Sequence, residues 1–166
     1  MTMSEPPQKS THKVEIVPVV LEPHPNADTL SIVRIFAGYT CCVRTTDWEG
    51  KTLGAYIPPD SVVDSSRPEF AFLAGHERIR VKKLRGIVSM GLLIPAPPGA
   101  QLGDDVAASL GVTHYEPPMP MSTAGDTEPP PAGYHPAFDI DSLRRYANVF
   151  EPGEPVWITE KIHGTS

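Results

Sequence analysis

Residues 77–94, Glu-Arg-Ile-Arg-Val-Lys-Lys-Leu-Arg-Gly-Ile-Val-Ser-Met-Gly-Leu-Leu-Ile, carry the clearest fold signal in the chain. Apolar and basic residues alternate in residues 77–84, with Ile79 and Val81 on one side and cations on the other. Such alternation is typical of a half-buried β-strand. Residues 86–94 predict a second strand that bends at its glycines. The stretch therefore predicts two consecutive strands, the first with a basic outer face.

Similar short runs precede this stretch. Strands are predicted over residues 14–21, 30–36, 40–45 and 53–57, because these runs are rich in β-branched and other apolar residues and are bounded by turn formers. A short helical turn is predicted over residues 69–73. A short helix is predicted over residues 104–110, with Asp104 able to cap it and Gly111 ending it. Five or six short strands with one small helix predict a mainly β fold, a five-stranded barrel of the oligonucleotide-binding (OB) type.

Two blocks of this region resemble a known family. They are His-Pro-Asn-Ala-Asp-Thr-Leu at 24–30 and Leu-Arg-Gly-Ile-Val-Ser-Met-Gly-Leu-Leu at 84–93, with Gly38 between them. Both are similar to the tRNA-binding barrel that is appended to some aminoacyl-tRNA synthetases, and they stand in the same order. The resemblance implies an OB barrel that binds RNA.

A cluster of cations supports the same expectation. Five basic residues within eight positions predict a track for nucleic-acid phosphates: Arg78, Arg80, Lys82, Lys83 and Arg85. The alternative is a solvated edge strand that its charge protects from pairing. The aromatic residues that could stack on bases are better explained as core: Phe36, Tyr39, Trp48 and Tyr56. His24 and Asp28 are expected to have structural roles in a proline-bounded turn.

Composition limits the remaining possibilities. Proline makes up 20 of 166 residues, which argues against a helical bundle. The net charge of −6 is uneven, since residues 1–100 hold 11 Lys and Arg against 10 Asp and Glu. The adjacent Cys41 and Cys42 lie within a predicted strand and are expected to be reduced, which favours a cytoplasmic protein. No apolar run approaches the roughly 18 residues of a membrane helix, so no membrane association is expected.

The chain divides into four predicted parts. Residues 1–13 predict a disordered leader, and residues 14–116 the OB domain. Seven prolines within residues 117–136 predict an extended linker. Residues 137–166 predict the start of a second, α+β domain, with a helix over 138–150 and a strand over 156–158 that delivers Lys161.

The last ten residues, Trp-Ile-Thr-Glu-Lys-Ile-His-Gly-Thr-Ser at 157–166, are the second chemical signal. A lysine that leaves a strand beside a glycine turn is placed for covalent chemistry, because the glycine lets backbone approach a phosphate. The lysine amine becomes a nucleophile once its pKa is lowered. Taken alone, however, Lys-x-x-Gly is more often an exposed lysine before a turn.

Thr159–Thr165 resembles the nucleotidyl-transfer motif of ATP-dependent RNA ligases, in particular the nick-sealing branch in which histidine replaces the aspartate of DNA ligases. The resemblance implies that Lys161 is the catalytic nucleophile that becomes lysyl-AMP. It also implies an ATP-binding role for the motif residues Glu160, Lys161, Ile162, His163 and Gly164, with Mg²⁺ or Mn²⁺ as cofactor. Ser166 departs from the asparagine that relatives often carry. The family's later motifs, including its metal-binding acids, are absent from this sequence, so the metal ligands stay unassigned.

The combined expectation is a monomeric RNA ligase that seals 3′-OH/5′-phosphate breaks in an RNA-containing duplex. The 166-residue chain supplies the OB domain and the nucleophile, and it is not expected to be active alone. The alternative is a non-catalytic tRNA- or RNA-binding OB module.

Overall fold

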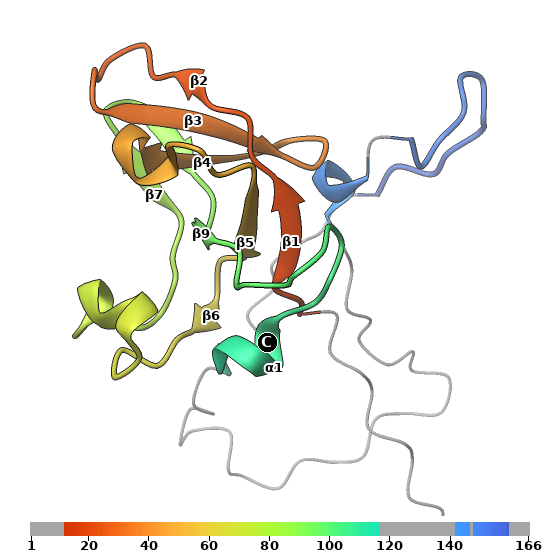
Figure 1. Ribbon diagram of the computed structural model, residues 1–166. Coiled ribbons are helices and arrows are strands. Elements are labelled where there is room, and N and C mark those ends of the chain that lie inside the picture. The colour runs from red at the N-terminus through yellow and green to blue at the C-terminus, as the bar shows by residue number, and fades with distance from the viewer. Residues whose placement is uncertain (1–11, 117–141, 147, 160–166) are drawn as a thin grey trace, which may run out of the picture.

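The computed structural model describes residues 12–116, 142–146 and 148–159 (Figure 1). Its strands are β1 (Glu15–Pro18), β2 (Glu22–Pro23), β3 (Leu30–Ile35), β4 (Tyr39–Arg44), β5 (Leu53–Ile57), β6 (Ser61–Val62), β7 (Lys82–Leu84), β8 (Ile87–Ser89), β9 (Leu92–Pro95) and β10 (Thr113–His114). Its helices are the 3₁₀ helices η1 (Thr45–Trp48), η2 (Pro68–Leu73) and η4 (Leu143–Arg145), and the α-helix α1 (Ala107–Leu110). Residues 12–116 form one unit, here named the β domain.

The antiparallel sheet β1-β5-β9 lies at the centre of the β domain. Its residues point alternately into two hydrophobic clusters, because successive side chains of a strand face opposite sides. Ala55 and Ile57 of β5 belong to one cluster, whereas Tyr56 between them belongs to the other. The central sheet is therefore buried on both faces, which explains its nearly continuous apolar sequence.

The second sheet, β2-β3-β4, packs against one side of this centre and is continued by the β7-β8 hairpin (Figure 1). Sequence-distant hydrogen bonds join β4 to the segment around β8. The Thr40 hydroxyl donates to the Val88 carbonyl at 2.6 Å, and the Met90 N–H donates to the Thr40 carbonyl at 2.7 Å. The hairpin is thus held along the edge of β4.

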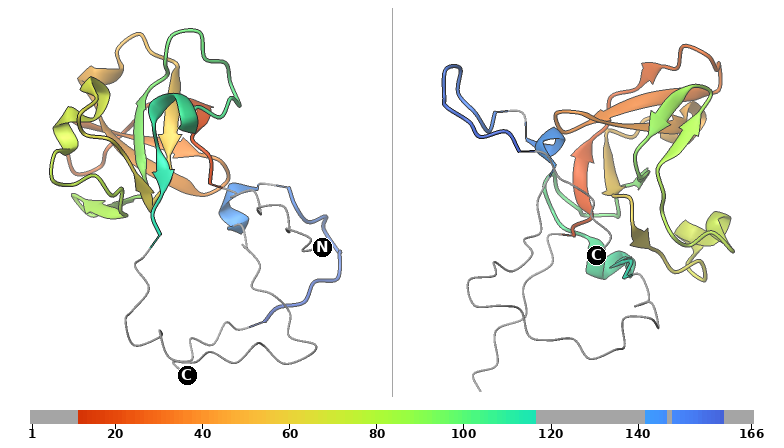
Figure 2. Two further views of the ribbon diagram at one scale, coloured as in Figure 1. Left: turned by 90° about the horizontal axis from the view of Figure 1, so that it is seen from below. Right: turned by 180° about the vertical axis from the view of Figure 1, so that it is seen from behind.

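The opposite end of the β domain is covered by η2, α1 and the short β6-β10 pair (Figure 2). Phe70 of η2 and Leu110 of α1 are buried in the cluster around Ile57. Gly111 follows α1 with φ +65°, and its N–H donates to α1 carbonyls. The predicted glycine stop is therefore confirmed. The α-helix itself is shorter than predicted, since Asp104 and Asp105 precede it and Asp105 Oδ1 accepts from the Ala107 N–H.

The mainly β expectation is confirmed, and β5 coincides with the predicted strand at 53–57. The single strand predicted over residues 77–84 is wrong. Residues 77–79 run beside β6, with the Ile79 N–H donating to the Ser61 carbonyl at 2.8 Å, and the chain then crosses to pair with β8 from Lys82 onward. Because the partner changes midway, Ile79 is buried whereas Val81 is 49% exposed.

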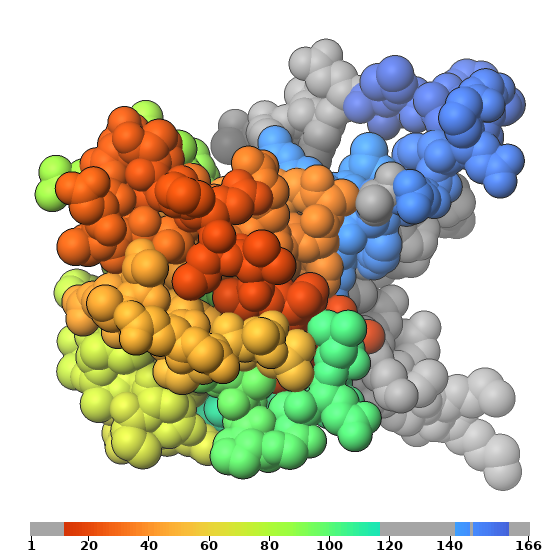
Figure 3. Space-filling view, turned by 45° about the horizontal axis from the view of Figure 1, so that its top comes forward, coloured from red at the N-terminus to blue at the C-terminus, as the bar shows by residue number. Residues whose placement is uncertain are grey.

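Beyond residue 116, η4 packs against the β domain on the side opposite η2, and residues 148–159 extend away from it (Figures 2 and 3). The helix predicted over 138–150 is, within the described residues, only the single turn η4. The strand predicted over 156–158 is not formed in the described part of the chain. A strand needs a neighbour for its backbone hydrogen bonds, and no described segment pairs with these residues. The predicted leader and linker lie almost entirely outside the described residues.

Among the residues that the structure describes, no helix is long and apolar enough to cross a membrane.

Candidate nucleic-acid interface

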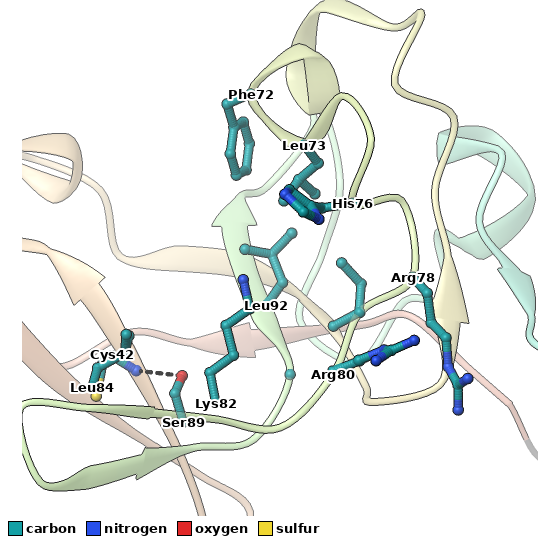
Figure 4. Close-up of a pocket in the computed structure, with 12 residues that line it drawn as sticks. Cys42, Phe72, Leu73, His76, Arg78, Arg80, Lys82, Leu84, Ser89 and Leu92 are labelled. Carbon is teal, nitrogen blue, oxygen red and sulfur yellow. Dashed lines mark hydrogen bonds between the residues drawn. The ribbon is translucent and has the colours of Figure 1, made fainter.

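A surface pocket of about 300 Å³ lies between η2 and the β7-β8 hairpin (Figure 4). Its walls are apolar, with Phe72 and Leu73 from η2 facing Leu84 of β7 and Leu92 of β9. Its rim carries Arg80 and other basic side chains. The pocket therefore joins an apolar lining to a cationic edge.

Two of the five predicted phosphate-binding residues are available at this rim. Arg80 and Lys82 are exposed, and Lys82 extends from β7 into the pocket (Figure 4). Neither side chain forms an ion pair with any of the residues that the structure describes. Both cations can therefore meet an anionic ligand without first breaking a salt bridge.

The third residue of the predicted track, Arg78, is already engaged. Its Nη2 lies 2.7 Å from Asp60 Oδ1, and its guanidinium stacks 3.6 Å from the centre of the Tyr115 ring. In Figure 4 its side chain points away from Phe72. Arg78 thus joins the turn between β5 and β6 to the segment after β10, and its charge is already paired.

The remaining two lie off the pocket. Lys83 is exposed and, as the next residue of β7, faces away from the side that Lys82 occupies. Arg85 is exposed at the turn of the hairpin with φ +47°, and its carbonyl accepts from Asn26 Nδ2 at 2.9 Å. The structure therefore places Arg78, Arg80 and Lys82 at one pocket, with Arg78 already paired, and Lys83 and Arg85 elsewhere on the hairpin.

Glu77, the acidic residue that precedes these cations in the sequence, forms no ion pair with them among the described residues. Glu77 Oε1 accepts from the Gly75 N–H at 2.8 Å and from the Ser65 hydroxyl at 2.9 Å. Backbone hydrogen bonds from its own amide and from Gly75, with the Ser65 bond, lower the pKa of Glu77. The carboxylate is thus ionised and held by its own loop.

Hydrogen bonds fix the hairpin side of the pocket. Ser89 Oγ accepts from the Cys42 N–H at 3.0 Å, which ties β8 to β4 (Figure 4). His24 is buried, accepts from the Asn26 N–H at Nδ1, and donates from Nε2 to the Leu84 carbonyl at 3.2 Å. The expected structural role of His24 is therefore confirmed, since it fastens the 24–30 loop to β7.

The aromatic residues divide as expected, with one addition. Trp48 and Tyr56 are buried, and Phe36 and Tyr39 pack against the same cluster. Phe72 is 66% exposed at the pocket and was not predicted from the sequence. The available signal was its spacing, because Phe70 and Phe72 stand two apart in one helical turn and cannot both face the core.

The predicted nucleophile and ATP-binding residues, 160–164, lie outside the described residues. Within the described part of the chain, no group of three His, Cys, Asp or Glu side chains could hold a metal ion.

Comparison with known proteins agrees with this architecture. The profile of a family described as an OB-fold domain matches residues 12–96, about half of the chain. The chain belongs to this OB-fold domain family. The chain is 31% identical over 115 residues to the phenylalanine–tRNA ligase beta subunit of Symbiobacterium thermophilum, and the match covers 58% of this chain and 12% of that protein.

The chain is also similar in structure to solved RNA ligases. Naegleria gruberi RNA ligase with PPi has a TM-score of 0.58 and 26% identity, covering 70% of this chain and 39% of that chain. A mutant of the same ligase with AMP and Mn has a TM-score of 0.57 and 26% identity, covering 69% and 38%. The chain thus spans well under two thirds of each of these relatives. The resemblance of the barrel to a domain of tRNA ligases is confirmed, and the likeness to RNA ligases holds at the level of the fold. The resemblance of the motif at Thr159–Thr165 stays a prediction.

Proposed function

We propose that this chain supplies the OB-fold domain and the nucleophile motif of an ATP-dependent RNA ligase that seals 3′-OH/5′-phosphate breaks. The observation that carries the proposal is the likeness of about 70% of the chain to Naegleria gruberi RNA ligase. The motif at Thr159–Thr165 supports it independently, because the structural likeness rests on the whole arrangement and the motif on seven residues.

In this proposal the Nζ of Lys161 attacks the α-phosphorus of ATP, the bond to pyrophosphate breaks, and lysyl-AMP forms. AMP then passes to a 5′-phosphate, and a 3′-OH attacks that phosphate and expels AMP. A divalent cation, Mg²⁺ or Mn²⁺, would neutralise charge on the phosphates. Because a lysine has a pKa of about 10.4 in water, the motif also needs cationic neighbours that lower this pKa.

The OB-fold domain would hold the broken RNA-containing duplex near this lysine. Its free cations Arg80 and Lys82 suit the phosphate backbone, even though the chain as a whole is acidic. We place the activity in a monomer and in the cytoplasm. The support for that compartment is chemical, since Cys41 and Cys42 are free thiols and disulfides persist mainly in oxidising compartments.

The test is transfer of label from ATP labelled at the α-phosphate. The protein that joins this chain to a catalytic ligase domain should take up label with a divalent metal, and Lys161→Ala should abolish the uptake. Lys13→Ala, a lysine at the start of the OB-fold domain, is the matched control. The 166-residue chain alone should take up almost none. Label retained after Lys161→Ala would place the nucleophile elsewhere and remove the proposal.

A second candidate is a non-catalytic RNA-binding module, which the 31% identity to a tRNA ligase subunit favours. This candidate predicts RNA binding with no labelled protein under any condition. Label transfer that depends on Lys161 therefore distinguishes the two.

A further inference from the structure

We propose that the pocket between η2 and the β7-β8 hairpin binds one unpaired nucleotide of an RNA strand, with the base stacked on Phe72 and its phosphates held by Arg80 and Lys82. The inference deepens the proposed function, because it names the part of the RNA that the OB-fold domain takes. It also holds for the alternative of a non-catalytic RNA-binding module, so the two proposals can fail separately.

The first argument is the position of Phe72. The short helix η2 is anchored by Phe70, which is fully buried, while Phe72 in the same helix is 66% exposed. The ring stands at the mouth of the pocket, beside Leu73 and His76 (Figure 4). An exposed phenylalanine at a pocket that cations also line offers an aromatic face on which any base can stack.

The second argument is charge. The cations at the rim, Arg80 and Lys82, have no acidic partner among the described residues, and the nearby Glu77 is held by its own loop. A neutral apolar ligand would gain nothing from these cations. A ligand with both a flat aromatic ring and negative charge satisfies the whole pocket, and a nucleotide has that chemistry.

The third argument selects an unpaired nucleotide. Inside a duplex both faces of each base are covered by its neighbours, so Phe72 could stack only on a base that has left the helix or lies in a single strand. A volume of about 300 Å³ is at the lower end of ligand pockets and suits one base, not a run of them. Neighbouring phosphates would lie along Lys82 and Arg80.

The experiment measures binding by the 166-residue chain. A single-stranded RNA 10-mer with one central 2-aminopurine is compared with the same strand in a full duplex and with free AMP. We expect the single strand to bind with quenching of the 2-aminopurine, and Phe72→Ala to weaken its binding about tenfold and remove the quenching. Phe72→Trp should restore both. Leu102→Ala, which removes another exposed apolar side chain, is the matched control.

Salt separates stacking from charge. Phe72→Ala should leave the slope of log affinity against log salt unchanged, whereas Arg80→Ala and Lys82→Ala should each reduce it by about 0.7. Phe72 is exposed, so its substitution should not unfold the domain. Unchanged affinity and quenching in Phe72→Ala would overturn the proposal. Equal binding of duplex, or equally strong binding of free AMP in the pocket, would also overturn it. If the label-transfer test showed that Lys161 is not the nucleophile, the proposed nucleotide pocket would be unaffected.

Discussion

At the scale of single residues, Gly91 occupies a position where the structure leaves no room for a side chain. It adopts φ +95°, and a Cβ there would lie 2.5 Å from the Ile57 carbonyl oxygen and 2.9 Å from the Tyr56 ring. Both neighbours belong to the buried central strand and cannot yield cheaply. We expect Gly91→Ala to lower the free energy of unfolding by about 2 kcal/mol or more, measured by urea denaturation.

Gly99 is the matched control for this prediction. It also has a left-handed backbone, with φ +81°, but a Cβ there meets nothing within 4 Å. Gly99→Ala should therefore cost only the backbone term, about 1 kcal/mol. Equal losses for the two variants would show that the close approach to Ile57 has no energetic effect.

At the scale of elements, the β6-β10 pair contains a pH-sensitive contact. His12 Nε2 lies 2.8 Å from Ser61 Oγ of β6, and its ring packs against His114 of β10 at 5.4 Å. Burial and then the charge of His114 lower the pKa of His12, although Asp105 opposes them. In the folded state His12 thus resists protonation more than in the unfolded chain.

The unfolded chain consequently binds more protons on His12 as pH falls below about 6.5. The stabilising contribution of His12 should be fully present above that pH and be lost as pH falls through its lowered pKa. Urea denaturation at pH 7.5 and pH 5.5 should show a loss of stability that is smaller in His12→Gln. An identical loss in the variant would assign the pH dependence to other groups.

Elements also show how far the sequence could predict the structure. Local patterns located most strands, because β5 and β3 alternate or run apolar between clear turn formers. The prediction of one strand over residues 77–84 was wrong, because the alternation along this segment does not reveal that its pairing partner changes from β6 to β8. For the same reason the pocket was not predicted, as it needs η2, β7 and β9 together. The sequence alone identified the five cations. It could not show that Arg78 pairs with Asp60, because that contact forms only in the tertiary structure.

At the scale of the whole molecule, η4 is fastened to the β domain. Arg145 Nη2 lies 2.8 Å from Glu15 Oε2 and its guanidinium lies 5.0 Å from the Phe36 ring centre, while the Ala37 N–H donates to the Arg144 carbonyl. We expect Arg145→Ala to release this contact and to speed hydrogen exchange at the Ala37 amide about fivefold. That factor corresponds to about 1 kcal/mol for a partly exposed ion pair.

The control for this prediction is Arg34→Ala, which removes an ion pair with Glu22 on the same domain. Exchange at Ala37 should be the same as in the unmodified chain. If Arg145→Ala leaves the Ala37 exchange rate unchanged, η4 is not held by this ion pair.

The two adjacent thiols of β4 differ in their accessibility to reagents. Because successive side chains of a strand face opposite sides, Cys41 is buried and Cys42 lies at the pocket. Burial raises the pKa of the Cys41 thiol to about 12. An alkylating reagent would therefore meet one thiol per folded chain and two per unfolded chain. The rate of the first modification would follow occupancy of the pocket, and the appearance of the second would follow opening of the core. One mass measurement on unlabelled protein would thus report ligand and fold separately.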